Sequence, residues 1–179
     1  MPSGPVAGSW GCYPEARVDD WRCEVALKSG SRVPEFRLTA GTGEVVDTRE
    51  LKGHPWVIYF YPKDHTSGCT IETRAFGRLL ADFRAAGAVV YGCSVGDVDA
   101  KRDFAASCGA PDLPLLADPD HQVAEMFGSW GPRPGGEGVH RNTFLVDSEG
   151  VVIRSWTGVQ PEGHAEDVLQ AVRELASAP

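Results

Sequence analysis

The chain has 179 residues, of which 42% are hydrophobic, and this suits one globular domain with a core of its own. Lysine and arginine total 17 against 25 acidic residues, giving a net charge of −8 that argues against nonspecific binding to nucleic acid or anionic membranes. No apolar run approaches the roughly 20 residues of a membrane span. The first residues lack a basic segment followed by an apolar one, so we expect no secretory signal and a cytoplasmic protein.

Five cysteines are present: Cys12, Cys23, Cys69, Cys93 and Cys108. Their number is odd, so at least one is unpaired in a monomer. None of them forms a C-x-x-C pair, which argues against a structural zinc site and against a thioredoxin-type dithiol. We expect thiols that stay reduced in the cytoplasm unless chemistry oxidises them.

The N-terminal third divides into an extension and the start of a domain. Residues 1–28 are rich in Gly, Pro and Trp and lack periodicity, which predicts an extension of unknown role before a domain spanning 29–179. Residues 35–47 alternate around two glycines and predict a β-hairpin. Residues 56–61 form an unbroken run of apolar strand formers, which is typical of a central strand buried on both faces.

A helix is predicted over residues 66–86. Four apolar residues recur at the spacing of one helix face: Phe76, Leu79, Leu80 and Phe83. Cys69 lies seven residues before Phe76, so it shares this inward face. Thr66 or Ser67 is suited to cap the first turn.

The remaining chain alternates strands and helices. Strands are predicted at 88–94 and 113–118, helices at 97–110 and 119–128, a Gly/Pro-rich loop at 129–140, a hairpin at 141–158 and a closing helix at 163–176. A parallel pair joined by a helical crossover, followed by a hairpin and a helix, is the thioredoxin-like α/β plan. We therefore expect a central mixed sheet flanked by helices.

A cysteine at the start of a helix can be reactive if its thiolate is stabilised, because the thiolate is the nucleophile. Lowering a cysteine pKa from about 8.5 to about 6 requires roughly 3.4 kcal/mol, whereas a helix N-terminus supplies only about 0.3–1 kcal/mol. A cation must supply the rest, and spacing does not choose among Lys63, Arg74, Arg133, Arg141 and Arg154. The alternative is that Cys69 is a small buried hydrophobic residue, as many free cysteines are.

The segment around this cysteine resembles a known family. "YPKDHTSGCTIE" is similar to the active-site segment of peroxiredoxins, in which Pro, three residues, Thr or Ser, and two residues precede the peroxidatic cysteine. Pro62, Thr66 and Cys69 match that spacing. The "FYPKD" start and Glu72 resemble the bacterioferritin-comigratory, or peroxiredoxin Q, subgroup, and the similarity extends over roughly residues 32–175.

The resemblance implies a thioredoxin-like fold with peroxiredoxin-type insertions and a role for each matching residue. Cys69 would be the peroxidatic nucleophile, Thr66 would hydrogen-bond the thiolate and the peroxide, and Pro62 would shield the sulfur from water. Arg141 would supply the cation, and no metal or other cofactor would be needed. The implied function is a thiol-dependent peroxidase that reduces hydrogen peroxide and organic hydroperoxides. Thioredoxin or a small thiol would recycle it, and monomers and dimers both occur in the family.

The sequence leaves open which thiol, if any in this chain, reacts with the oxidised Cys69. Many members of the subgroup carry a resolving cysteine five residues after the first, but that position is Arg74 here. Cys108 lies in the helix where other members place it. The alternatives are no internal resolving cysteine, Cys12 or Cys23 on a mobile arm, and Cys93, which ends a core strand.

Two further alternatives accompany this interpretation. Glu72 either anchors the active-site loop or is an exposed first-turn carboxylate favoured by the helix dipole. The domain could also be a redox sensor or holdase that passes oxidation to a partner without sustained turnover. An enzyme would consume many equivalents of peroxide, whereas a sensor would stop near one.

Overall fold

The computed structural model describes residues 25–178. Cys12, Cys23 and most of the predicted extension therefore lie outside the described residues. The boundary near residue 28 stays a prediction, although the N–H of Leu27 donates to the Phe127 carbonyl at 3.1 Å. None of the described helices is long and apolar enough to span a membrane.

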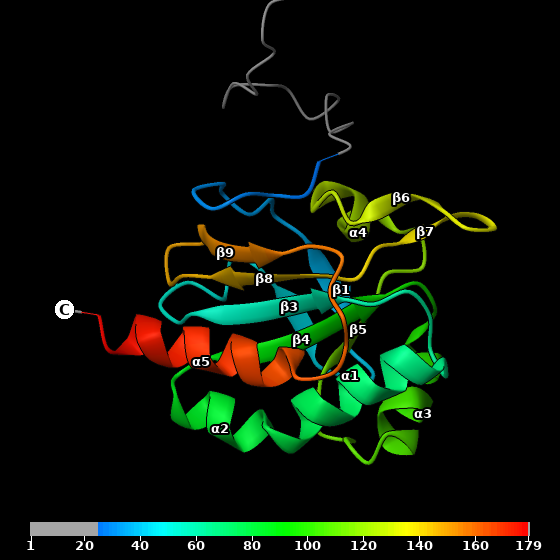
Figure 1. Ribbon diagram of the computed structural model, residues 1–179, viewed down its shortest axis with the longest axis horizontal. Coiled ribbons are helices and arrows are strands. Elements are labelled where there is room, and N and C mark those ends of the chain that lie inside the picture. The colour runs from blue at the N-terminus through cyan, green and yellow to red at the C-terminus, as the bar shows by residue number, and fades with distance from the viewer. Residues whose placement is uncertain (1–24, 179) are drawn as a thin grey trace, which may run out of the picture.

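The described residues build one central sheet of five strands (Figure 1). In spatial order these are β5 (Leu115–Ala117), β4 (Val89–Ser94), β3 (Trp56–Phe60), β8 (Asn142–Val146) and β9 (Val152–Trp156). β3 pairs in parallel with β4, and β4 with β5, whereas β8 runs antiparallel to both β3 and β9. The predicted thioredoxin-like mixed sheet is confirmed.

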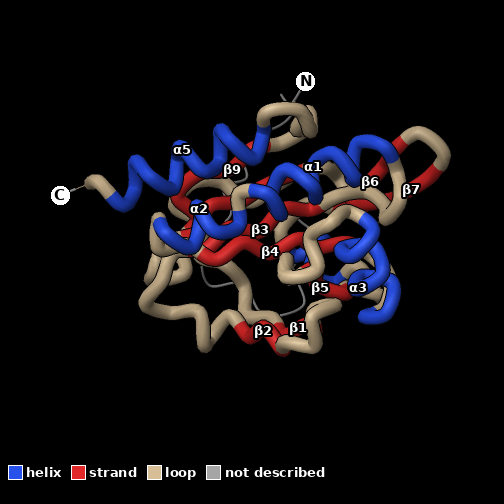
Figure 2. The backbone as a smooth tube through the Cα atoms, turned by 90° about the horizontal axis from the view of Figure 1, so that it is seen from below, coloured by secondary structure: helices blue, strands red, loops and turns tan. Residues whose placement is uncertain are grey.

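Helices cover both faces of this sheet (Figures 1 and 2). On one face lie α1 (Ser67–Arg78), α2 (Leu80–Ala85) and α5 (His164–Ala176), with α3 (Val98–Ser107) beside β5. The other face is covered by α4 (Gln122–Met126) and by the two-stranded sheet of β1 (Arg37–Thr39) and β2 (Val45–Asp47). Each side of the sheet therefore has its own apolar cluster.

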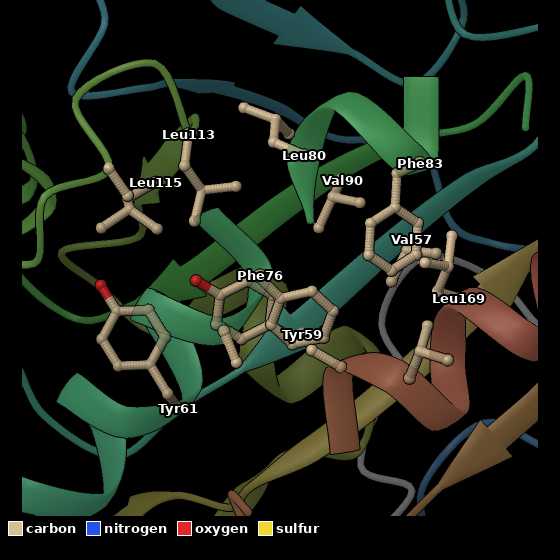
Figure 3. Close-up of a cluster of buried hydrophobic side chains, with 14 of the residues drawn as sticks. Val57, Tyr59, Tyr61, Phe76, Leu80, Phe83, Val90, Leu113, Leu115 and Leu169 are labelled. Carbon is tan, nitrogen blue, oxygen red and sulfur yellow. The ribbon is translucent and has the colours of Figure 1, made fainter. Parts of the chain in front are cut away.

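Strand β3 separates the two clusters. Val57 and Tyr59 belong to the cluster under α1, α2 and α5, whereas Trp56, Ile58 and Phe60 belong to the opposite one. All five side chains are buried, so the prediction of a strand buried on both faces is confirmed. In the first cluster, Phe76 of α1 stacks on Tyr59 with ring centroids 4.3 Å apart (Figure 3).

The prediction of one continuous helix over 66–86 is wrong. The segment consists of two helices that meet at Leu79, whose φ of −93° and ψ of 3° depart from helical values. Gly77, two residues earlier, is a weak helix former and packs so closely that an added Cβ would lie 2.3 Å from the Cβ of Ala110. The break still leaves Phe76 and Phe83 buried on the same side.

The loop predicted over 129–140 is also wrong. These residues form a hairpin of β6 (Trp130–Arg133) and β7 (Gly136–Val139), in which Arg133 pairs with Gly136 across a two-residue turn. The glycines at 135 and 136 have φ values of 91° and 137°, which residues with side chains rarely adopt. The Gly and Pro residues that suggested a loop are those that a tight hairpin turn requires.

A buried histidine gives the fold a pH dependence. His164 begins α5, its Nε2 lies 2.8 Å from the Thr143 hydroxyl, and burial lowers its pKa to about 4. Between pH about 6.5 and about 4, the unfolded chain binds a proton here and the folded chain does not. The free energy of unfolding should therefore fall on acidification through this window, by up to about 3 kcal/mol.

The substitution His164→Gln isolates this contribution. Urea unfolding of wild type and variant at several pH values should give a stability difference that shrinks as the pH falls from about 6.5 to about 4. A difference that does not change with pH would show that His164 does not titrate in this way.

Candidate active site

The first turn of α1 places Cys69 at the edge of the apolar cluster. Its side chain is completely buried. The first hydrogen bond of this helix runs from the Thr70 N–H to the Thr66 carbonyl, so the N–H groups of Gly68 and Cys69 lack an acceptor within the helix. These donors and the positive end of the helix dipole favour negative charge near the sulfur.

Thr66 occupies the N-cap position of α1, but its side chain does not cap the helix. Its hydroxyl instead donates to the Lys63 carbonyl at 3.0 Å, inside the loop that precedes the helix. This bond links Lys63 to Thr66 within the loop of residues 62–66, and it orients the hydroxyl. For Thr66 to donate to a thiolate or a peroxide, this hydroxyl would have to rotate away from Lys63, because it carries one proton.

Arg141 supplies a cation at the buried sulfur. Its Nη2 donates to Cys69 Sγ at 3.4 Å across a separation of 72 residues. Strand pairing explains the approach: Phe60, the last residue of β3, pairs with Asn142, the first of β8. Arg141 therefore lies just beyond that end of the sheet, where the chain of β3 turns toward α1.

Glu72 holds Arg141 from the other side. Its Oε2 accepts a hydrogen bond from Arg141 Nη1 in an ion pair, and its carboxyl is completely buried. Burial raises the pKa of Glu72 to about 7, and the ion pair with Arg141 acts in the opposite direction. The alternative of an exposed first-turn carboxylate is wrong. Glu72 follows Cys69 by three residues and so lies on its helix face, a spacing that predicts burial.

A pocket of about 440 Å³ opens over this group. It is lined by Pro62, Lys63, Thr66, Gly68, Arg133, Pro134, Gly135, Gly136, Glu137 and Arg141. The loop before α1 forms one wall and the β6–β7 hairpin forms the other. Sequence reasoning missed the second wall, because it treated the hairpin as a loop. Within residues 25–178, no group of three His, Cys, Asp or Glu side chains is arranged to hold a metal ion.

The other two described cysteines occupy different surroundings. Cys108 is the C-cap residue that follows α3, and it is buried in the same apolar cluster as Cys69. Burial raises the pKa of Cys108, and the neighbouring Cys69 adds to the rise. Cys93 of β4 is buried in the cluster on the opposite side of the sheet. Cys69, Cys93 and Cys108 are all free thiols in this conformation.

The ion pair with Glu72 should orient Arg141. The variant Glu72→Ala leaves the guanidinium without its anchor and should slow peroxide oxidation of Cys69 up to about 100-fold, since small displacements of a positioned group are costly. Glu72→Gln keeps an oxygen that accepts from Nη1 and should recover most of this loss. Stopped-flow measurement of Cys69 oxidation decides: equal rates in both variants would mean that Glu72 does not orient Arg141.

A buried thiol at a helix start, faced by an arginine beneath a small pocket in a thioredoxin-like fold, is the arrangement expected of a thiol-dependent peroxidase. The comparisons with known proteins agree. The sequence model described as "AhpC/TSA family" matches residues 29–155. The chain belongs to this family, and within it to the bacterioferritin-comigratory, or peroxiredoxin Q, group.

Individual relatives carry the same assignment. Peroxiredoxin Bcp of Bacillus subtilis is 34% identical over 156 residues, which are 85% of this chain and 99% of the relative. A structure of Xanthomonas campestris peroxiredoxin Q is 36% identical with a TM-score of 0.75, covering 79% of this chain and 92% of that one. Peroxidoxin BcpB of Mycobacterium tuberculosis is 31% identical with a TM-score of 0.75, covering 83% and 98%.

Proposed function

We propose that Cys69 is the peroxidatic nucleophile of this peroxidase and that it reduces hydrogen peroxide and organic hydroperoxides. The single observation that carries the proposal is the contact of Arg141 Nη2 with Cys69 Sγ at 3.4 Å. A guanidinium at this distance can donate to the sulfur and to the charge that develops on a departing peroxide oxygen. The alkyl substrates are supported by a Xanthomonas campestris relative, 36% identical, whose structures address its alkyl peroxide reduction activity.

The proposed reaction is the attack of the Cys69 sulfur on a peroxide bound in the pocket. The Cys69 thiolate attacks one peroxide oxygen, a sulfur–oxygen bond forms and the O–O bond breaks. The departing oxygen takes up a proton and leaves as water or an alcohol, and Cys69 is oxidised by two electrons to a sulfenic acid. Arg141 and the N–H groups of Gly68 and Cys69 stabilise the charge that develops on the departing oxygen. Thr66 and Pro62 shape the pocket around the reacting atoms.

The cycle is completed by thiols. One thiol attacks the sulfenic sulfur and releases water, and a second thiol reduces the resulting disulfide. We propose thioredoxin or a small thiol as the reductant and Cys108 as the candidate for an internal resolving cysteine. The burial of Cys108 in the same cluster as Cys69 supports this choice over Cys93, which packs on the other side of the sheet. We also propose a cytoplasmic setting, in which thiols stay reduced.

Turnover tests the proposed function. The protein, thioredoxin, thioredoxin reductase and NADPH are mixed with excess hydrogen peroxide, and NADPH oxidation is followed. We expect many equivalents of peroxide to be consumed for each protein molecule. Consumption that stops near one equivalent, also with dithiothreitol as the reductant, would instead support a redox sensor.

A further inference from the structure

A lysine without contact to solvent lies on α3. The side chain of Lys101 is completely buried. Its Nζ donates to Asp64 Oδ2 at 2.8 Å and to the Val95 carbonyl at 2.7 Å. A buried ammonium group is costly unless it is paired and hydrogen-bonded, so the position of Lys101 depends on Asp64.

Asp64 is held through both of its oxygens. While Oδ2 accepts from Lys101, Oδ1 accepts from the hydroxyl of the buried Tyr61 at 2.7 Å. The Lys101 ammonium also lies 5.4 Å from the centroid of the Tyr61 ring, within the range of a cation–π contact. Lys101, Asp64 and Tyr61 thus form one buried polar cluster. Asp64 lies midway between Pro62 and Thr66, so the cluster fixes the middle of the loop that forms the pocket wall.

The next residue of the loop shows that its backbone is held in an unfavourable shape. His65 has a φ of 61°, a left-handed conformation that costs roughly 1–2 kcal/mol for a residue with a side chain. Such a conformation persists only where the surroundings enforce it. The His65 ring packs edge-on against Phe104, with ring centroids 5.1 Å apart. Phe104 lies one turn after Lys101 on the same helix. Helix α3 therefore contacts the loop at two consecutive residues.

From these contacts we infer that Lys101 and Asp64 are positioning residues for the peroxidase reaction. They touch none of the reacting atoms; they hold the loop of residues 62–66 in the shape that places Pro62 and Thr66 in the wall of the pocket, beside Arg141. Lys101 belongs to α3 and Asp64 belongs to the loop. The shape of the loop and the folding of this helix therefore depend on each other. Unwinding of α3 that reaches Lys101 and Phe104 would therefore also release the loop.

The double variant Lys101→Met/Asp64→Asn removes both charges and leaves neither charge buried alone. Replacing a buried ion pair in this way often leaves stability unchanged. We expect the rate of Cys69 oxidation by hydrogen peroxide to fall about tenfold or more through loss of positioning, at an unchanged midpoint of urea unfolding. We also expect faster amide hydrogen exchange in both residues 62–66 and 98–108.

The matched control is Arg78→Met/Glu166→Gln, which removes an exposed ion pair between α1 and α5. It should change neither the oxidation rate nor the exchange. If the Lys101 double variant does not fold, Tyr61→Phe serves, since it removes one hydrogen bond to Asp64 and leaves the ion pair with Lys101 intact. A wild-type oxidation rate in a stable variant, or faster exchange confined to α3, would overturn the inference.

The kinetic part of this inference rests on the proposed function, whereas the exchange part does not. If wild-type Cys69 itself failed to react with peroxide, the proposed function would fail. Faster amide hydrogen exchange in residues 62–66 and 98–108 of the Lys101→Met/Asp64→Asn variant would then still establish the coupling between the loop and α3. Unchanged exchange in that variant would show that the two segments are not coupled.

Discussion

Replacing Cys69 with serine is expected to reduce peroxide consumption to the rate of the protein-free reaction. A serine hydroxyl is essentially un-ionised at neutral pH and is a weak nucleophile without an adjacent base. The side chain in hydrogen-bond contact with Cys69 is Arg141, which donates and cannot remove a proton. The coupled NADPH assay measures the loss.

The control for this variant is Cys108→Ser, which removes a buried thiol from the same apolar cluster. It should leave the first oxidation of Cys69 at the wild-type rate, whatever it does to later steps. Sustained turnover by Cys69→Ser would assign the nucleophile to another thiol.

Replacing Arg141 with glutamine is expected to slow the reaction of Cys69 with peroxide by about 100- to 1,000-fold, the usual effect of removing a donor aimed at developing charge. The variant loses the donor at 3.4 Å from Sγ. It leaves the carboxylate of Glu72 buried beside an uncharged partner, which should destabilise the fold as well.

The double variant Arg141→Gln/Glu72→Gln separates these two effects. It removes both charges of the buried pair, so most of the stability should return while the slow reaction remains. Arg154→Gln is the matched control, because that guanidinium lies 4.9 Å from the Trp156 ring and does not line the peroxide pocket. Wild-type kinetics in the double variant would remove Arg141 from the mechanism.

Much of the fold and the place of the thiol follow from local patterns in the sequence. The unbroken apolar run at β3 predicts a strand buried on both faces, and the seven-residue step from Cys69 to Phe76 predicts a thiol on the buried helix face. Both are confirmed. Local patterns succeed here because the period of side chains along a strand or a helix decides which residues face a core.

The cation could not be predicted from spacing. Arg141 reaches Cys69 through the pairing of Phe60 with Asn142, and such long-range pairing leaves no local periodicity. Only the family resemblance indicated it. The cluster of Lys101, Asp64 and Tyr61 was missed for a related reason: a lysine on a predicted helix reads as a solvated residue, and its burial depends on partners 37 and 40 residues away.

The most direct test of the account is peptide mass spectrometry of the reduced protein after one equivalent of hydrogen peroxide, with a sulfenic-acid trap present. We expect Cys69 to be modified first, either as the trapped sulfenic acid or as a disulfide with Cys108. A trapped acid alone would mean that reduction comes from outside the chain, and a Cys69–Cys108 disulfide would mean an internal resolving thiol. A Cys69 that stays reduced while peroxide is consumed would contradict the account.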